Sequence, residues 1–248
     1  MQISVTILTK NAGETLLSTL MSVQKFPEII ILDTGSTDDT LKIAEQFPNV
    51  KIFSTNFTGF GPLHNQATAL ATGDWVLSID SDEVLTPELG EEIQKLTLDP
   101  ETVYSLPRDN YFNGKRIRYC AGWYPDPVVR LYNRRTTHFT DDAVHEKVVT
   151  DGLRLVALKS PLKHTPYRNM AHFLDKMQKY TTLFAEQNRG KKHSSVSKAL
   201  GHSVGAFIKN YFFKRGFMGG KEGLIISLYN AQTAFYKYLK LAELNKKL

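Results

Sequence analysis

The chain has 248 residues, of which 42% are hydrophobic and 23% are charged, and its formal net charge is +6. This composition excludes a disordered or collagen-like chain, and the length suits one large α/β domain or one such domain with a helical appendage. The single cysteine, Cys120, excludes an internal disulfide framework and a cysteine-based zinc site, so we expect a reducing compartment. We find no signal-peptide pattern at the start and no stretch of roughly 18 apolar residues, and we expect a soluble or peripheral protein.

The first 96 residues alternate between strand and helix patterns. Apolar residues predict strands over residues 3–8, 28–32 and 75–79, and residues 50–54 predict a further short strand. Apolar residues at helical spacing predict helices over residues 12–25, 41–47, 62–71 and 87–96. We expect Ser36 or Thr37 to cap the second helix and Gly73 to end the third. This order is typical of an open, mostly parallel sheet with helices on both faces, which binds ligands at the carboxyl ends of its strands.

The rest of the chain differs in pattern and in charge. Arginines alternate with aromatic residues over 100–163, which favours short strands and turns, and helical spacing returns from about Asn169, with 189–195 as an exposed linker. Residues 1–160 hold 15 Lys and Arg against 21 Asp and Glu, a net charge of −6, whereas residues 161–248 hold 16 against 4, a net charge of +12. Such a basic region needs an anionic partner: nucleic acid, an anionic membrane or a phosphorylated substrate.

Two carboxylates follow the fourth predicted strand directly. Asp80 and Asp82 flank Ser81, and in a turn their side chains can converge on one cation. Hard oxygen ligands suit Mg²⁺ or Mn²⁺, which commonly bridge a protein carboxylate to a substrate diphosphate. A solvated turn is the alternative, and the position at the end of a buried strand favours the metal site.

Other polar residues leave two interpretations open. Asp33, at the end of the second strand, suits either a turn with a helix cap or hydrogen bonding to a nucleoside. His145 and His164, taken alone, suit structural roles as well as ligand roles, and Glu146 suits a general base if it lies beside a cleft. The chain lacks a complete dinucleotide fingerprint and a P-loop sequence, which disfavours a dehydrogenase or a P-loop enzyme.

Taken in order, these motifs resemble glycosyltransferase family 2, the inverting nucleotide-sugar enzymes with the GT-A fold. The resemblance covers about residues 1–165 and is carried by segments 4–11 with Glu14, 32–38, Asn65, 73–75 and 79–83. It implies an α/β fold with a GT-A-type, mostly parallel sheet, flanking helices and a helical C-terminal region. Residues 1–165 would form the nucleotide-sugar-binding and catalytic domain, and residues 166–248 a basic helical region that docks the acceptor or a membrane.

Further segments are similar to the bacterial lipopolysaccharide-core branch of the family, which includes heptose β-1,4-glucosyltransferases. They are 113–115, 122–126, 130–132, 144–146 and 216–220. This resemblance implies a UDP-sugar donor, expected to be UDP-glucose, and a lipopolysaccharide-core or related glycan acceptor. It also implies a cytoplasmic enzyme that contacts the inner face of the cytoplasmic membrane. The chain departs from many relatives at Leu8 and Lys10, where they carry Pro and Tyr, and at His64, where they often carry Arg.

The resemblance also implies roles for individual residues. The expected donor-binding residues are Thr9, Asn11, Glu14, Asp33, Asn65, Asp80 and Ser81. Within this set the first four would line the uridine pocket, and Asp80 would lie near the ribose and the metal. Asp82 would coordinate Mg²⁺ or Mn²⁺, and His164 would complete the metal–diphosphate site. Glu146 would be the general base, with Asp126 as the reserve candidate.

A module that binds anionic lipid or nucleic acid through the basic C-terminal region is the alternative from another class. It would explain the charge of +12 but not the ordered acidic motifs. We therefore expect a UDP-sugar donor, a glycan or lipid-linked acceptor and a peripheral contact with an anionic membrane, and we do not expect a nucleic-acid partner.

Overall fold

The computed structural model describes residues 2–120, 122–167 and 169–246, and the chain divides into two compact units. The sheet unit consists of Met1–Arg108 and Asp126–His164, and the helical unit of Asp109–Pro125 and Thr165–Leu248. Residues 109–125 therefore lie in the helical unit, whereas the sequence-based division after residue 165 places them in the first range. The roles given to the two ranges stay predictions.

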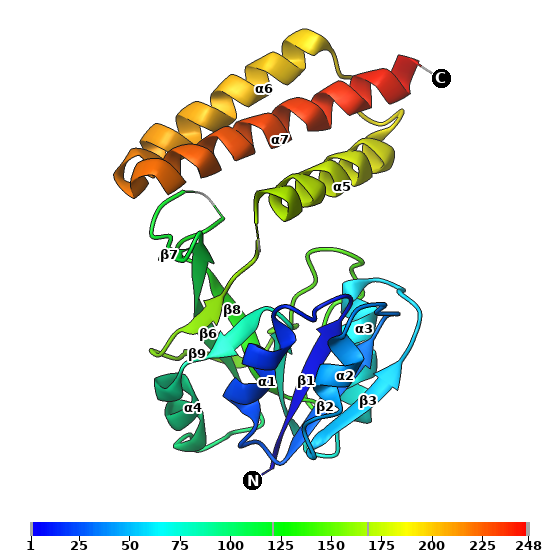
Figure 1. Cartoon of the computed structure of the whole chain (residues 1–248), viewed down its shortest axis with the longest axis vertical. Coiled ribbons are helices and arrows are strands. Elements are labelled where there is room, and N and C mark those ends of the chain that lie inside the picture. The colour runs from blue at the N-terminus through cyan, green and yellow to red at the C-terminus, as the bar shows by residue number, and fades with distance from the viewer. Residues whose placement is uncertain (1, 121, 168, 247–248) are drawn as a thin grey trace. The chain divides into compact units, whose positions relative to one another are not determined.

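Four parallel strands form one side of the sheet, in the order β3-β2-β1-β4, and Figure 1 shows β1, β2 and β3 next to one another. They are β1 (Ile3–Thr9), β2 (Glu28–Asp33), β3 (Val50–Ser54) and β4 (Trp75–Asp80). Thr9 pairs with Asp33, and Leu8 pairs with Asp80. This register brings the carboxyl ends of β1, β2 and β4 to one edge of the sheet.

The sheet continues beyond β4 in the order β8-β6-β10-β5, with β7 and β9 also paired to β6. These strands are β5 (Glu83–Leu85), β6 (Thr102–Phe112), β7 (Lys115–Arg116), β8 (Pro127–Asn133), β9 (Arg154–Ala157) and β10 (Leu162–His164). The pairs β4–β8, β6–β8 and β5–β10 are antiparallel, and β9 lies parallel to β6. The predicted strands and turns of residues 100–163 are confirmed.

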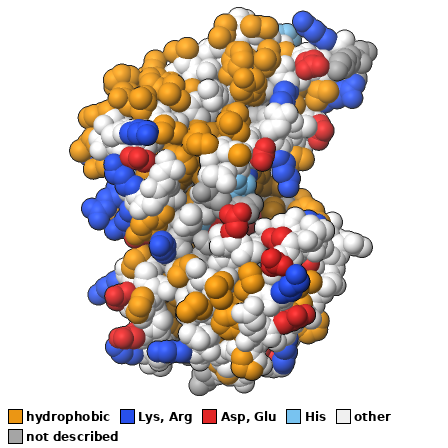
Figure 2. Space-filling view, in the orientation of Figure 1, with side chains coloured by type: hydrophobic (Ala, Val, Ile, Leu, Met, Phe, Trp, Pro, Cys, Tyr) orange, Lys and Arg blue, Asp and Glu red, His pale blue; other side chains and the backbone are white. Residues whose placement is uncertain are grey.

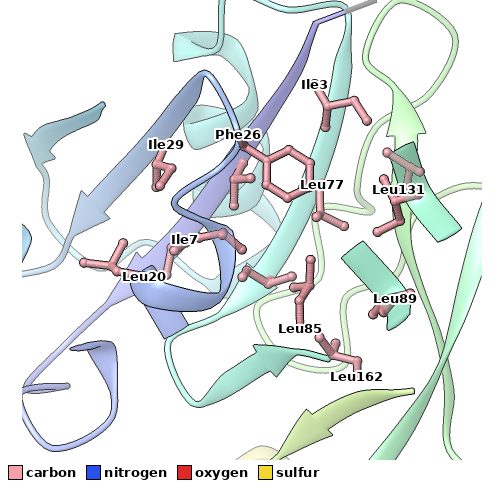
Figure 3. Close-up of a cluster of buried hydrophobic side chains, with 14 of the residues drawn as sticks. Ile3, Ile7, Leu20, Phe26, Ile29, Leu77, Leu85, Leu89, Leu131 and Leu162 are labelled. Atoms are coloured by element: carbon pink, nitrogen blue, oxygen red, sulfur yellow. The ribbon is translucent and has the colours of Figure 1, made fainter. Parts of the chain in front are cut away.

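Apolar side chains cover both faces of the central strands. All six residues of β2 are buried, as expected for a strand between helical layers. Figure 3 shows Ile7, Leu20, Ile29 and Leu77 directed into one cluster, to which β1, β2, β4 and the first helix contribute. A second cluster that includes Ile30 packs on the opposite face.

The four predicted helices of the sheet unit are present: α1 (Leu16–Val23), α2 (Thr40–Ala44), α3 (Phe60–Leu70) and α4 (Pro87–Gln94). Helices α1, α2 and α4 are shorter than predicted, and α3 begins two residues earlier and ends one residue earlier than predicted. The predicted cap of α2 is wrong, because its N-cap is Asp39, and the Ser36 hydroxyl instead donates to the Asp33 carboxylate. Gly73 does not end α3 either, since Ala71 is the C-cap. A Cβ at Gly73 would lie 2.7 Å from the carbonyl oxygen of Gln2, so the close approach of β1 explains this glycine.

The helical unit contains α5 (Met170–Asn188), α6 (Val196–Ile208), the short turns η1 (Lys209–Phe213) and η2 (Gly216–Gly219), and α7 (Gly220–Lys246). Figure 1 shows α5 and α6 alongside α7, and the predicted linker lies between α5 and α6. The core of this unit is aromatic, with the Phe173 ring stacked on the Tyr229 ring at 3.6 Å. Within the described residues, we find no helix with the length and apolar character needed to cross a membrane.

Candidate active site

The loop after β2 is held by the Asp33 carboxylate. It accepts hydrogen bonds from the hydroxyl groups of Thr9 and Ser36 and from the backbone N–H groups of Gly35 and Ser36. Burial favours a higher pKa for Asp33, but the hydrogen bonds outweigh it and leave the pKa below its usual value. Asp33 therefore remains ionised and fixes the turn at the end of β2, while its contact with a nucleoside stays a prediction.

The loop after β1 is tied to the loop after β2. The Asn11 side-chain oxygen accepts from the Thr37 N–H at 2.8 Å, and the Asn11 N–H donates to the Ser36 hydroxyl at 2.8 Å. The Lys10 ammonium donates to the carbonyl oxygens of Thr34 and Gly35, each at 2.8 Å. Lys10 thus joins the two loops at a position where many relatives carry Tyr. Glu14 lies exposed in the first of these loops.

Buried charges of alternating sign follow the end of β4. The Arg130 guanidinium contacts the carboxylates of Asp80 and Glu83, and the Arg108 guanidinium contacts Glu83 at 2.9 Å and Asp126 at 2.8 Å. The second oxygen of Glu83 accepts from the Asp80 N–H at 2.9 Å. Burial favours a higher pKa for Asp80, but the attraction of Arg130, together with smaller contributions from neighbours that include Arg108, outweighs burial and lowers the pKa. Buried charges persist only when they are paired, so this network keeps Asp80 ionised and fixed in place.

Asp82 and His164 meet because β5 pairs with β10. His164 lies opposite Glu83 in this antiparallel ladder, and its Nε2 atom is 3.6 Å from Asp82 Oδ1. Ser81, between the two acids, accepts a hydrogen bond at its carbonyl oxygen from the Thr19 hydroxyl. Strand pairing thus brings Asp82 and His164 together although they are 82 residues apart in the sequence.

The donor atoms of Asp82 and His164 fit a divalent cation with an incomplete protein shell. A carboxylate oxygen and an imidazole nitrogen can each bind a metal ion. Among residues 2–120, 122–167 and 169–246, no group of three His, Cys, Asp or Glu side chains could hold a metal. Two side chains suit Mg²⁺ or Mn²⁺, because these ions commonly take their other ligands from water and substrate phosphates.

Glu146 lies in a loop that residues of α3 hold. The Asn65 side chain accepts from the Phe139 N–H at 2.8 Å and donates to the Phe139 carbonyl oxygen at 2.9 Å. At the start of α3, a Cβ on Gly61 would lie 1.9 Å from the Thr140 carbonyl oxygen, so only glycine allows this approach. Asn65 thus supports the loop that carries Glu146, and its predicted contact with the donor stays a prediction.

The Glu146 carboxylate faces a buried, neutral histidine. Glu146 Oε1 lies 3.8 Å from Nε2 of His64, whose ring stacks on Phe139 at 4.4 Å and has Nδ1 3.1 Å from the Ser78 hydroxyl. Burial lowers the pKa of His64 to about 4. Burial raises the pKa of Glu146, and the negative charge of Asp80 adds to the effect. A carboxylate with a raised pKa is suited to accepting a proton near neutral pH.

Asp126, the reserve candidate for the base, has a different environment. Its Oδ2 atom accepts from Arg108 Nε at 2.8 Å, within the charge network that also contains Asp80. A guanidinium at this distance occupies one of the carboxylate oxygens. This geometry favours Glu146 over Asp126 as the proton acceptor.

The structure therefore gathers the predicted residues around the carboxyl ends of β1, β2 and β4, in the sheet unit. The sequence did not identify Arg108, Glu83 or Arg130 as partners of the acidic residues, nor His64 and Ser78 as neighbours of Glu146. The signals for the arginines are their alternation with aromatic residues over 100–163 and the segment 130–132, and neither indicates their partners.

Comparisons with known proteins show similarity to glycosyltransferases. The model of the family described as Glycosyl transferase family 2 matches residues 4–154. An uncharacterized glycosyltransferase of Rickettsia felis is 29% identical over 265 residues, which cover 100% of this chain and 90% of that protein. The lipopolysaccharide core biosynthesis glycosyltransferase LpsC of Rhizobium meliloti is 25% identical over 233 residues, covering 89% of this chain and 84% of LpsC.

Solved structures show weaker likeness. A structure of S. aureus TarS 1–349 in complex with UDP-GlcNAc has a TM-score of 0.48 and 16% identity, and the match covers 100% of this chain and 91% of that one. The predicted α/β fold is confirmed. It has a GT-A-type, mostly parallel sheet with flanking helices and a helical C-terminal region. With more than half of its residues matched by the family model, the chain belongs to glycosyltransferase family 2.

Proposed function

We propose that the protein is an inverting, metal-dependent glycosyltransferase that moves glucose from UDP-glucose to a lipopolysaccharide-core or related glycan acceptor. The observation that carries the proposal is the Asp82–His164 pair at 3.6 Å, placed directly after the ionised Asp80 at the end of β4. The motifs similar to the lipopolysaccharide-core branch support the acceptor class, as does the likeness to a relative whose name assigns it to lipopolysaccharide core biosynthesis.

The donor would bind across the carboxyl ends of β1, β2 and β4. Thr9, Asn11, Glu14 and Asp33 would surround the uridine, and Asp80 would accept from the ribose hydroxyl groups. The hydrogen bonds that hold the two loops together support this arrangement, because they fix the loop backbone before any ligand binds. Preorganised groups lose less entropy on binding than mobile ones.

Asp82 and His164 would hold Mg²⁺ or Mn²⁺, which supplies positive charge to the leaving diphosphate when it is bound. The paired charges of Arg130 and Glu83 support this role, because they hold the Asp80 turn rigidly beside the two ligands. Ser81, between the two acids, would complete this turn around the donor.

Glu146 would act as the general base. It would take the proton of an acceptor hydroxyl as that oxygen bonds to the anomeric carbon and the UDP oxygen leaves with the electrons of the broken bond. One displacement inverts the anomeric configuration, so no covalent enzyme intermediate is required. The raised pKa of Glu146 supports this assignment, and Asp126 remains the second candidate.

A screen of UDP-sugars tests the proposal. UDP release is measured for several UDP-sugars with an acceptor extract, in Mn²⁺, in Mg²⁺ and in chelator. We expect UDP-glucose with a divalent cation to give the highest rate, and Asp82→Asn to lose the cation dependence. Preference for another nucleotide sugar would overturn the donor, and equal rates in chelator would overturn the metal.

The C-terminal region has a separate proposed role, in docking the acceptor or the membrane on the cytoplasmic side. The excess of positive charge over residues 161–248 supports it, since glycolipid cores and bilayer surfaces carry anionic groups. The same region would bind anionic lipid in the alternative function, which lacks a use for the ordered acidic motifs.

A further inference from the structure

Helix α6 carries an apolar face that no other described part of the chain covers. Five side chains follow one another at four-residue spacing, four on α6 and the fifth on η1, and each is between 41% and 58% exposed. We call this set the apolar ridge: Val196, Leu200, Val204, Ile208 and Phe212. Residues four apart are neighbours on a helix surface, so the ridge is a continuous row that winds around the helix by about 40° per step.

Other residues of the helix account for its packing. Within the helix, Ala199 is the buried residue among those described, and α6 packs along α7. The rings of Phe207 and Tyr211 are half-buried and stacked on each other at 5.3 Å. Packing within the helical unit therefore explains Phe207 and Tyr211 but not the apolar ridge.

The ridge ends in a turn with large exposed side chains. Phe213 is 78% exposed, and Phe217 and Met218 are each 52% exposed. Lys214 and Arg215, between these residues, are exposed as well. Exposed apolar groups gathered in one place mark an interaction surface, since a monomeric protein surface rarely carries such a patch.

The positive charge around the apolar ridge indicates what kind of partner binds it. Residues 187–221 contain eight Lys and Arg and no Asp or Glu. These cations are Arg189, Lys191, Lys192, Lys198, Lys209, Lys214, Arg215 and Lys221. Figure 2 shows hydrophobic side chains gathered over the surface of the helical unit, with Lys and Arg side chains at the margins. Apolar and aromatic groups beside unopposed cations suit a bilayer interface, where rings lie at headgroup level and cations meet lipid phosphates.

We propose that the apolar ridge and the Phe213 turn form a membrane-binding surface that lies in the headgroup region of an anionic bilayer. The proposal deepens the docking role of the C-terminal region by naming its partner and its residues. It rests on the proposed function only for its purpose, which is to bring the enzyme to a lipid-linked acceptor. A second copy of the chain is a poorer partner, because two copies of this cationic surface would repel each other.

Vesicle binding tests the proposal with the full chain. The protein is sedimented with phosphatidylcholine vesicles and with vesicles that also contain phosphatidylglycerol, at low and high salt, with no donor present. We expect binding to the anionic vesicles that falls with salt. Equal recovery in the supernatant under all conditions would overturn the proposal.

Matched variants distinguish binding through the apolar ridge from non-specific hydrophobic binding. Phe212→Ser with Phe213→Ser removes two exposed rings, and we expect a loss of about tenfold or more in the vesicle partition coefficient. The control is Met21→Ser with Leu155→Ser, which removes two side chains of 55% and 56% exposure from the sheet unit. An equal loss in the control would overturn the assignment to the ridge, and circular dichroism checks that both variants fold.

A charge pair of variants completes the design. Lys214→Gln with Arg215→Gln should lower the partition coefficient by about fivefold per charge. Lys42→Gln with Lys95→Gln changes the net charge by the same amount in the sheet unit, where both lysines are paired with acids, and should have little effect. If the ridge variants instead abolish a dimer in sedimentation velocity, and neither vesicle type binds, the partner is a second copy and the membrane proposal is wrong.

The same experiment distinguishes this proposal from the proposed function. Vesicle binding without donor does not depend on catalysis, and donor hydrolysis by the Phe212→Ser, Phe213→Ser variant should match that of the unaltered protein. Vesicle binding without any UDP-sugar turnover would contradict the proposed function alone. Turnover without vesicle binding would contradict the membrane surface alone.

Discussion

The Ser78 hydroxyl lies 3.1 Å from Nδ1 of His64, on the other edge of the ring from Nε2, which faces Glu146 Oε1 at 3.8 Å. A neutral imidazole has one donor nitrogen and one acceptor nitrogen, whereas a hydroxyl can donate or accept. The tautomer of His64 is therefore linked to the role of Ser78: if the hydroxyl donates to Nδ1, Nε2 carries the hydrogen. In either tautomer the neutral ring places no positive charge beside the Glu146 carboxylate.

The first prediction concerns stability against pH. The folded pKa of His64 is about 4, below the usual 6.5, so between these values the unfolded chain binds a proton that the folded chain does not. Above pH 6.5 this group does not reduce the free energy of unfolding. As the pH falls from 6.5 toward 4, protonation of the unfolded chain lowers the free energy of unfolding by about 3 kcal/mol in all. Urea unfolding of His64→Gln between pH 4 and 7 should show a flatter profile than the parent chain.

The groups that face His64 set the conditions for that comparison. They are Glu146 on its loop, Asp80 and Ser78 on β4, and the charged Arg130 and Glu83. His138→Gln, at the surface of the sheet unit, is the control for the loss of an imidazole. Identical profiles for His64→Gln and the parent chain would show that folding does not lower the pKa of His64 and would contradict the prediction.

The second prediction concerns the general base. Loss of a positioned base costs about 10²–10⁴-fold in rate, so Glu146→Gln should lower kcat by that factor and change UDP affinity little. The raised pKa of Glu146 also predicts that kcat falls in acid at a pH above the ordinary glutamate value of 4.5. Steady-state kinetics across pH with the best UDP-sugar measures both effects.

Asp126→Asn is the comparison for the base. It removes the carboxylate that contacts Arg108 at 2.8 Å, so we expect a loss of stability with a smaller loss in kcat at a temperature where the variant is folded. If Asp126→Asn loses the acid limb and Glu146→Gln keeps it, the two roles must be exchanged.

The third prediction concerns the cation. Asp82→Asn should weaken the Mn²⁺-dependent binding of UDP, because a neutral amide is a poorer ligand than a carboxylate, and it should leave the melting temperature of the ligand-free protein nearly unaltered. Calorimetric titration of UDP with and without Mn²⁺ measures the difference. Asp151→Asn, at an exposed turn of the sheet unit, is the control for a lost negative charge. Equal Mn²⁺ dependence in both variants would remove Asp82 from the site.

The fourth prediction concerns the support of the Glu146 loop. Gly61→Ala would place a methyl group 1.9 Å from the Thr140 carbonyl oxygen, so the loop must shift, and we expect a loss of about 1–3 kcal/mol in the free energy of unfolding together with a lower kcat. Gly90→Ala, inside α4 with no atom within 4 Å of the new Cβ, should raise stability by about 0.5–1 kcal/mol. Unfolding curves and kinetics of the two variants test the contrast.

Strands β1, β2 and β4 were predictable because each is an apolar run whose burial follows from local sequence. Strand β2 is the clearest case, since it is buried along its whole length. The cap of α2 was not predictable, because a serine hydroxyl can either cap a helix N-terminus or donate to a nearby carboxylate. In the structure the Ser36 hydroxyl donates to Asp33 and does not cap the helix. Local sequence contains both possibilities, and only the folded loop selects one.

The site was predictable to the extent that its residues lie at strand ends or in familiar motifs. Asp80 and Asp82 follow from the end of β4, and Glu146 from its resemblance. The partners of these acids depend on strand pairing between distant segments, as with Arg130, which reaches Asp80 because β8 lies antiparallel to β4. Such pairings have no signature within either strand, so neither the charge network nor the Ser78–His64 contact could be foreseen.

The pairing of β5 with β10 also determines when the Asp82–His164 pair can form during synthesis of the chain. The four parallel strands leave the ribosome before β10, and N-terminal elements can begin to fold during synthesis. A nascent chain that ends before residue 164 can form the Asp33 turn and the Asp80 turn, but it lacks the imidazole that stands 3.6 Å from Asp82 in the finished protein. The Asp82–His164 pair is therefore among the last features of the sheet unit to be completed during translation.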